Sequence, residues 1–232
     1  MEKNFEMDSE KNVKVLLVIM SCYKNRSLWE KLKNIDNRSI IFYGNPNQQD
    51  EYILDNQILS LKCEDTYDHL PHKILLMIKA ITNLTNFKDV THIFKIDDHD
   101  TKFNSNTIDN ITEIQNLSSL HYGGQLLQHY YLYNKLVEFP HGGIRSWHFK
   151  KCPVDSYWNN KLYKGPYTTW ADGGCGYLLS KKSMNLITEY YDSNQDDIFK
   201  NHIYEDLMLA LILFHHNILG TKIEKIIQGD KG

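Results

Sequence analysis

The sequence lacks three features that would place it in a broad functional class. No apolar run approaches the roughly 20 residues needed to cross a bilayer, and the apolar segment 13–20 is too short for a secretory signal. The formal net charge of −3 provides no general basic field for nucleic acid. We therefore expect a soluble cytoplasmic protein with no membrane span and no nucleic-acid partner.

Cysteine pairs and phosphate-binding glycines are also missing. The four cysteines, Cys22, Cys63, Cys152 and Cys175, form no C-x-x-C pair, so a zinc site is not indicated and buried free thiols are expected. No glycine-rich signature follows the first apolar segment. The loop Ser21–Arg26 nevertheless opens a predicted helix, which makes it either an anion site or an ordinary strand–helix connection.

The pattern along 232 residues predicts an α/β fold with a mostly parallel central sheet flanked by helices. Residues 1–12 are polar and form an expected flexible tail, and residues 13–232 form one domain. Strands are expected at 13–20, 39–43, 58–62, 91–96, 120–127 and 222–227, with a strand or helix at 177–179. Helices are expected over about ten residues after Arg26, at 74–84, from Phe103 to about Leu117, at 181–191 and at 207–214.

An acidic cluster follows the strand at 91–96. Asp97, Asp98 and Asp100 come directly after it, and like charges held close together destabilise a fold unless a cation lies between them. In extended chain, residues two apart share a face, so Asp98 and Asp100 are the candidate ligands of a divalent ion. A solvated acidic turn explains the same residues.

Three further segments are candidates for a site. The segment Trp170–Ser180 places three glycines beside Asp172, which permits a ligand or a tight turn. Glu205 and Asp206 precede the most apolar helix, where acidic residues often only cap. The aromatic stretch 128–169 suits sugar faces, a buried loop or a partner surface equally. Its acceptor candidates, together with Trp170, are His141, Gly142, Gly143, Trp147, Tyr157 and Trp158.

Four segments resemble motifs of the inverting β-1,3-glycosyltransferases of the galactosyltransferase and Fringe type. Asp65–Lys73 resembles D-x-Y-x-N-L-x-x-K with His69 in place of Asn, and Lys95–Thr101 resembles K-x-D-D-D-T with one extra residue. Gly173–Lys181 resembles G-G-A-G-Y-V-L-S-K, and Glu205-Asp206-Leu207 resembles E-D-V. The resemblance extends over roughly residues 13–218.

This resemblance implies a GT-A-like fold, a nucleotide-sugar donor (UDP-linked by preference) and a glycan or glycoprotein acceptor. It implies Mn²⁺ or Mg²⁺ bound by Asp98 and Asp100, with Asp100 the direct ligand, and Asp206 as the catalytic base. The extra residue leaves open whether Asp97 or Asp98 holds the first acidic position. The family's C-terminal metal-binding His has no clear match, so waters or His215 would complete the coordination. Residues implied to bind the donor are Ser21, Arg26, Asp65, Lys73, Lys95, Asp97, Asp98, Trp170, Asp172, Gly173 and Gly174.

The expected reaction is a single displacement that inverts the anomeric carbon, with Asp206 taking the proton of the acceptor hydroxyl. Two alternatives stay open. One is a non-catalytic sugar-binding module of the same shape, and the other is a metal-dependent phosphoesterase that uses Asp97, Asp98, His99 and Asp100. Members of this type in eukaryotes are usually membrane-tethered, so a chain without an anchor is expected to be a bacterial or viral version, or a trimmed one.

Overall fold

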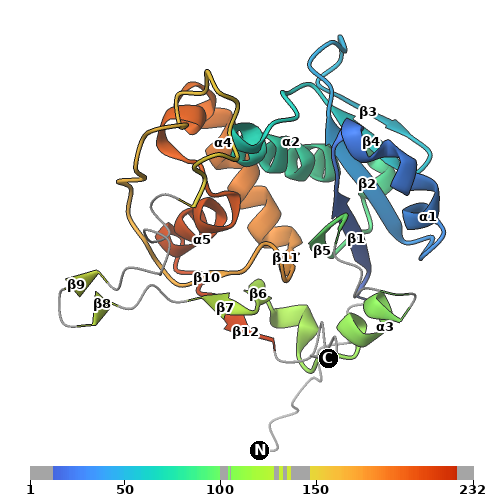
Figure 1. Cartoon of the computed structure of the whole chain (residues 1–232). Helices are drawn as coiled ribbons and strands as arrows, with labels where there is room; N and C mark the ends of the chain where they lie inside the picture. The colour runs from blue at the N-terminus through green and yellow to red at the C-terminus, as the bar shows by residue number, and fades with distance from the viewer. Residues whose placement is uncertain are drawn as a thin grey trace, which may run out of the picture.

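A computed structural model describes residues 13–99, 104, 106–127, 131–132, 135–136 and 147–223, with the backbone alone at 131–132 and 135–136. Within these residues, one mixed sheet of eight strands lies between helices on both faces (Figure 1). The expected α/β fold with a mainly parallel central sheet is therefore confirmed. The predicted tail, residues 1–12, lies outside the described residues.

The central sheet has a parallel half and a mixed half. Strands β5, β1, β2 and β4 run parallel to one another, whereas β11 is antiparallel to both of its neighbours and β3 is antiparallel to β4. In sheet order the strands are β12 (Thr221–Lys222), β6 (Tyr122–Gly124), β11 (Tyr177–Ser180), β5 (His92–Asp97), β1 (Val15–Met20), β2 (Ser39–Gly44), β4 (Ile58–Leu61) and β3 (Tyr52–Asp55). Two small ribbons pair β10 (Trp170–Ala171) with β7 (Leu126–Leu127) and β8 (Tyr131–Leu132) with β9 (Lys135–Leu136).

Helices cover the sheet unequally. The three long helices α2, α4 and α5 pack against one another on one face, and the short helices α1 and α3 lie on the other (Figure 1). Their bounds are α1 (Trp29–Lys33), α2 (Leu70–Asn83), α3 (Thr107–Thr112), α4 (Lys181–Asn201) and α5 (Glu205–His215), with 3₁₀-helices at Tyr23–Leu28, Tyr67–His69, Thr85–Phe87 and Leu117–Ser119. None of the helices in the described ranges has the length and apolar character that crossing a membrane requires.

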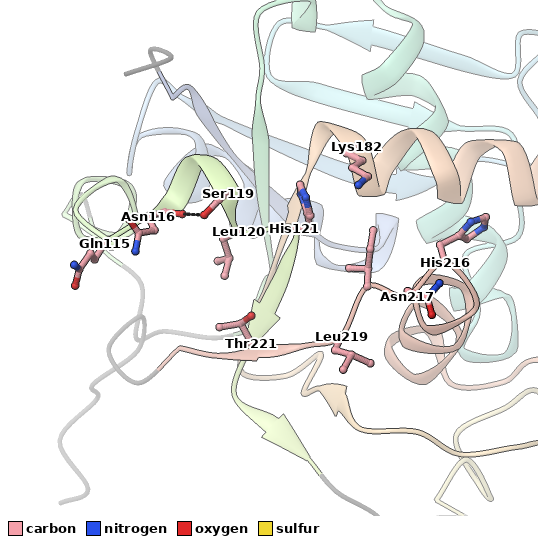
Figure 2. A pocket seen from close by; sticks show the side chains of 11 residues that line it. Gln115, Asn116, Ser119, Leu120, His121, Lys182, His216, Asn217, Leu219 and Thr221 are labelled. Carbon is pink, nitrogen blue, oxygen red and sulfur yellow. Dashed lines mark hydrogen bonds between the residues drawn. The ribbon is translucent and has the colours of Figure 1, made fainter. Parts of the chain in front are cut away.

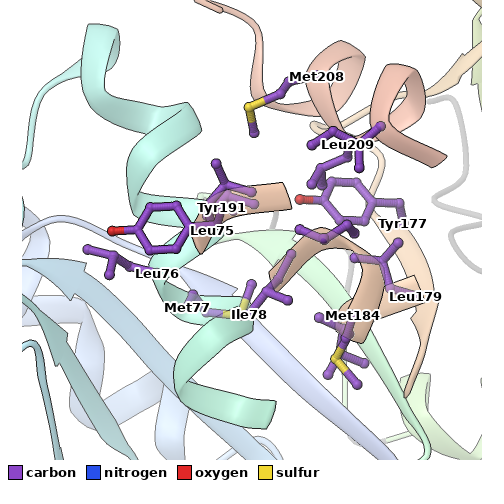
Figure 3. Packing of buried hydrophobic residues seen from close by; sticks show 14 of the residues in the cluster. Leu75, Leu76, Met77, Ile78, Tyr177, Leu179, Met184, Tyr191, Met208 and Leu209 are labelled. Carbon is purple, nitrogen blue, oxygen red and sulfur yellow. The ribbon is translucent and has the colours of Figure 1, made fainter. Parts of the chain in front are cut away.

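The alternation of side chains along β1 divides the interior into two cores. Leu16 and Val18 point into the larger core beneath α2, α4 and α5, and Leu17 and Ile19 point into the smaller core beneath α1 and α3. Figure 3 shows the larger core, where side chains from α2, α4, α5 and β11 pack together. Because α5 is apolar on nearly all sides, it is buried along most of its length and its start is held firmly beside the sheet.

The strand register gathers several loops at one edge of the sheet. Met20 at the end of β1 pairs with Asp97 at the end of β5, and the parallel strands β2 and β4 end at the same edge. The chain therefore leaves four neighbouring strands side by side. In parallel sheets this edge is where ligands usually bind.

The structure corrects several predicted elements. The helix after Arg26 is a 3₁₀-helix followed by the five-residue α1, and the polar helix expected from Phe103 to Leu117 is limited to α3 among the described residues. The strand expected at 120–127 is divided at Gln125 into β6 and β7, which belong to different sheets. Helix α4 continues ten residues past Tyr191, with a kink at Asn194. Strand β3 was not predicted.

Other predictions hold. Strands β1, β2, β4 and β5 and helices α2 and α5 lie where the pattern placed them, and residues 177–179 form a strand. The edge strand expected at 222–227 is matched only at Lys222: β12 is Thr221–Lys222, Ile223 is not in a strand, and residues 224–227 lie outside the described residues. All four cysteines are free thiols: Cys63 and Cys152 are buried, and Cys22 and Cys175 are partly exposed.

Candidate active site

The first cluster of the candidate site is built where β1 and β5 end. The Ser21 hydroxyl donates a hydrogen bond to Asp98 Oδ2 over 2.7 Å, and Asn25 Nδ2 donates to the same oxygen over 2.9 Å. The Trp29 indole N–H in turn donates to Ser21 Oγ at 2.8 Å. These residues, Ser21, Asn25, Trp29 and Asp98, are the Asp98 cluster. Asp98 is only 8% exposed, so these donors replace the water that its carboxylate loses.

A buried ion pair joins the neighbouring loops to this cluster. The Asp65 carboxylate accepts hydrogen bonds from the backbone N–H of Tyr23 (2.7 Å) and Gly44 (3.0 Å) and from Lys73 Nζ (2.8 Å). Lys73 Nζ also donates to the Ser21 carbonyl oxygen at 3.0 Å and is 3% exposed. Asp65 and Lys73 thus hold together the loops that follow β1, β2 and β4.

A cavity of about 470 Å³ opens in front of Asp65. Tyr23 and Tyr43 form its aromatic wall, with ring centroids 6.0 Å apart, and the guanidinium of Arg26 lies 4.7 Å from the centroid of the Tyr23 ring. The rest of the lining consists of Gly44, Asn45, Pro46, Asn47, Glu64, Asp65 and Thr66, most of them polar. The two rings are inclined at 35° to each other, and either of them, with amide and backbone groups nearby, could stack on a planar heterocycle.

The second cluster lies on the opposite face of β5. Lys95 Nζ donates to Asp97 Oδ1 (2.6 Å), to Glu205 Oε1 (3.0 Å) and to the carbonyl oxygen of Gly173 (3.2 Å). The Tyr177 hydroxyl donates to the other oxygen of Glu205 at 2.9 Å. Lys95 is completely buried, and its pKa is raised because the attraction of Asp97 and Glu205 exceeds the cost of desolvation.

Asp206 completes this second cluster at the start of α5. Its Oδ2 accepts a hydrogen bond from the backbone N–H of Gly173 at 3.1 Å, and its Oδ1 accepts one from the N–H of Leu207 at 2.8 Å. Burial, followed by the neighbouring carboxylate of Glu205, raises the pKa of Asp206 to about 7, although these hydrogen bonds and Lys95 act in the opposite direction. We call Lys95, Asp97, Gly173, Glu205 and Asp206 the Asp206 cluster.

The glycines of the segment 170–180 have different roles. A Cβ at Gly173 would lie 2.7 Å from Glu205 Oε1, and a Cβ at Gly176, whose φ is +85°, would lie 2.7 Å from the Phe94 ring. Gly174 has more space, and its N–H donates to Asp172 Oδ1 at 2.9 Å. Close packing therefore accounts for Gly173 and Gly176 without a ligand.

The remaining predicted residues are divided between core, surface and undescribed segments. The rings of Trp158 and Trp170 are each 5% exposed and belong to the larger core, whereas Trp147 is 60% exposed and Tyr157 44%. His215 is exposed at the end of α5. Asp100 and His141 to Gly143 lie outside the described residues.

The acidic end of β5 places carboxylate oxygens, which are possible metal ligands, on both faces of the strand. Asp97 turns toward Lys95 and Asp98 toward Ser21, so the two adjacent carboxylates point apart, and the exposed His99 has its Nδ1 3.5 Å from Asp98 Oδ1. No group of three or more His, Cys, Asp or Glu residues is placed to hold a metal ion within the described residues, 13–99, 104, 106–127 and 147–223. Carboxylate oxygens suit a hard divalent ion, but those of Asp97 and Asp98 do not converge on one point.

A second cavity, of about 620 Å³, lies at the opposite edge of the sheet. Figure 2 shows it between His121, Lys182 and His216, near the start of β6 and the end of β11. It has no carboxylate in its lining and is separate from both acidic clusters.

Sequence reasoning did not identify several parts of the site. It named Glu205 only as a possible cap, and it gave no role to Asn25, Trp29, Tyr177 or the aromatic wall. The position of Tyr23 and Tyr43 just after two strand ends was the available signal for the cavity. The chain matches no protein-family model, and no curated protein shows significant sequence similarity to it.

Proposed function

We propose that this chain is an inverting, metal-dependent glycosyltransferase of GT-A type that moves a sugar from a UDP-sugar to an acceptor hydroxyl. The observation that carries the proposal is Asp206. This carboxylate has a pKa of about 7, is fixed by two backbone N–H groups and lies in a network with the acidic end of β5. A general base works best when its pKa is near the working pH.

Asp206 would take the proton from the acceptor hydroxyl as that oxygen attacks the anomeric carbon of the donor sugar. The C–O bond to the acceptor forms while the bond to the nucleoside diphosphate breaks, and a single displacement inverts the configuration. General-base assistance of this kind contributes about 10²–10⁴-fold to the rate. Lys95 is buried away from any ligand, so it acts through Asp97 and Glu205, whose positions it fixes.

The donor would occupy the edge where β1, β2, β4 and β5 end. The cavity beside Tyr23 and Tyr43 suits the planar base, and Arg26 is the nearby cation for the diphosphate. Asp65 and Lys73 are bonded to each other and to the loop backbone, which fits a positioning role better than direct contact with the donor. Asp98 and, by the resemblance, Asp100 would hold Mn²⁺ or Mg²⁺, which neutralises charge on the departing diphosphate.

The test is a thermal-shift and calorimetric screen of nucleotide sugars with and without Mn²⁺, followed by measurement of UDP release with the donors that bind. A ligand that binds only the folded state raises stability according to its concentration relative to Kd. We expect UDP and a UDP-sugar to stabilise the chain in the presence of Mn²⁺. Absence of any shift across the screen would overturn the proposed function.

The exposed rings of Trp147 and Tyr157 favour one alternative, a carbohydrate-binding module without catalysis. It predicts saccharide binding together with no release of UDP from any bound donor. UDP release that depends on Asp206 excludes this alternative.

A further inference from the structure

The segment 147–164 carries a local positive charge on a chain whose net charge is negative. It contains four lysines and one aspartate, whereas the whole chain has a formal charge of −3. Two of these lysines lie against exposed rings: Lys151 Nζ is 3.7 Å from the ring centroid of Trp147, and Lys161 Nζ is 3.3 Å from that of Tyr157. We call Trp147, Lys151, Tyr157 and Lys161 the aromatic platform.

Hydrogen bonds anchor the platform to the elements around the active site. His148 is completely buried, with its Nδ1 2.8 Å from the hydroxyl of Tyr204 and its Nε2 2.8 Å from the carbonyl oxygen of Lys161. Tyr204 is the residue before α5 and stands two positions before Asp206. Trp158 Nε1 donates to the Phe199 carbonyl oxygen at 2.7 Å, and the Ser156 hydroxyl donates to Asp68. The platform is therefore fixed in place relative to α5.

Tyr67 lies beside the platform. Lys151 Nζ lies 5.3 Å from the centroid of its ring. Burial raises the pKa of Tyr67, and the charges of several groups, that of Asp206 first, raise it further. The contact that joins the platform to the start of α5, where Asp206 lies, is the hydrogen bond between His148 and Tyr204.

The cations of the platform have no acidic partner within the described part of the chain. Each of Lys151 and Lys161 contacts an aromatic ring, and no carboxylate of the described residues forms an ion pair with either. Exposed aromatic rings stack on the C–H faces of sugars and gain from removal of apolar surface from water. An unpaired ammonium group beside them favours an anionic substituent on the same ligand.

We propose that the aromatic platform is the acceptor subsite and that the acceptor is a saccharide that carries an anionic group, such as the carboxylate of a uronic acid. The proposal rests on the proposed glycosyltransferase function. The sugar ring contacts Trp147, and the anionic group pairs with Lys151. An acceptor hydroxyl on this sugar would then lie toward the start of α5, where Asp206 is placed.

The experiment compares methyl β-D-glucuronide with methyl β-D-glucoside, which share a ring and differ in charge. Binding to the full chain is measured by saturation-transfer NMR at low ionic strength, without donor. We expect the glucuronide to bind at least about fivefold more tightly than the glucoside, and Lys151→Met to remove that preference. Trp147→Ala should weaken both glycosides by about fivefold.

Two controls keep the result decisive. Lys182→Met removes an exposed lysine at the second cavity, and it should leave the preference for the glucuronide unchanged. Inorganic phosphate is the second probe: phosphate that binds as tightly as the glucuronide, with no effect of Trp147→Ala, would reveal a simple anion site and overturn the proposal. Equal binding of the two glycosides by the unmodified chain, or a preference that survives Lys151→Met, would overturn it as well.

The readout is independent of the donor. Failure of the glycoside experiment together with stabilisation by UDP and Mn²⁺ would remove the acceptor subsite and leave the transferase proposal intact. Glycoside binding without any response to UDP would instead remove the transferase and support a saccharide-binding module.

Discussion

The two carboxylates at the centre of the candidate site, Asp98 and Asp206, are surrounded by different partners, and Asp98 is buried whereas Asp206 is partly exposed. Asp98 receives hydrogen bonds from two neutral side chains, Ser21 and Asn25, both to the same carboxylate oxygen. Asp206 receives backbone N–H groups but lies beside the second carboxylate of Glu205, and its pKa is raised to about 7. The proposed function uses this difference, with Asp98 proposed for cation binding and Asp206 for proton transfer.

The substitution Asp206→Asn tests the proposed difference between the two carboxylates most directly. The amide cannot take a proton and retains only one of the two oxygens that accept the backbone N–H groups, so sugar transfer should fall by about 10²–10⁴-fold while binding of UDP with Mn²⁺ is unchanged. Transfer is measured as UDP release, and binding by calorimetry. Asp196→Asn, at an exposed position of α4, is the matched control. Normal turnover in the Asp206 variant would remove this residue from the mechanism.

The next largest effect is expected from the buried ammonium group of Lys95, which belongs to the Asp206 cluster. Lys95→Met leaves Asp97 and Glu205 buried without their shared partner, and breaking a buried pair in this way costs about 3–5 kcal/mol of the free energy of unfolding. Urea unfolding measures the loss. Lys182→Met, at an exposed lysine, should change stability by less than about 0.5 kcal/mol. Similar stabilities for the two variants would show that the Lys95 network is not a structural support.

Ser21→Ala tests the Asp98 side of the comparison. The change removes one donor from the Asp98 carboxylate and leaves the Trp29 indole N–H without its acceptor. We expect a loss of about 1–3 kcal/mol in unfolding free energy and weaker Mn²⁺-dependent binding of UDP. Ser119→Ala, at an exposed hydroxyl that bonds only to the nearby Asn116 carbonyl oxygen, is the control. A variant as stable as the control would show that the donors of Asp98 contribute little.

The smallest expected effect is on the pH dependence of stability. The folded-state pKa of Asp206 is raised from 3.8 to about 7, so between these values the folded chain binds more protons than the unfolded chain. Its contribution to stability is therefore lost as pH rises through that window. Asp206→Asn removes this loss, and the variant should gain about 1 kcal/mol or more over the parent between pH 5 and pH 8.

Thermal unfolding of both proteins at the two pH values measures this difference. Parallel pH profiles would indicate that Asp206 is ionised throughout the range. In the same window, transfer by the parent should fall about tenfold for each pH unit below 7, because only the ionised base accepts a proton.

The sequence predicted the parallel half of the fold better than the mixed half. Strand β1 is a continuous apolar run, which indicates a strand buried on both faces, and β5 has an apolar centre broken by Lys95. The segment 120–127 also contains apolar residues, but at Gly123 and Gly124 an added Cβ would lie 2.7 Å from the Thr221 carbonyl oxygen and 2.8 Å from that of Gly176. Those approaches come from distant segments, so local pattern cannot reveal them. The half-exposed edge strand β3 was not predicted because its sequence contains no long apolar run.

The site shows the same limit. Asp206 and the acidic end of β5 were found because each lies in a recognisable local motif. The sequence named Ser21 and Lys95 but did not predict their pairings: Lys95 meets Glu205 across 110 positions of sequence, and Ser21 meets Asp98 across 77. Tertiary structure alone creates these pairs.

Gly173 links the two halves of the Asp206 cluster through its backbone. Its N–H holds the proposed base, and its carbonyl oxygen holds the ammonium group that neutralises Asp97 and Glu205. A shift of this one residue would alter the basicity of Asp206 and the charge balance behind it together. Any movement of the 172–174 loop would therefore change the proton affinity of Asp206 and the ion pairs of Lys95 at the same time.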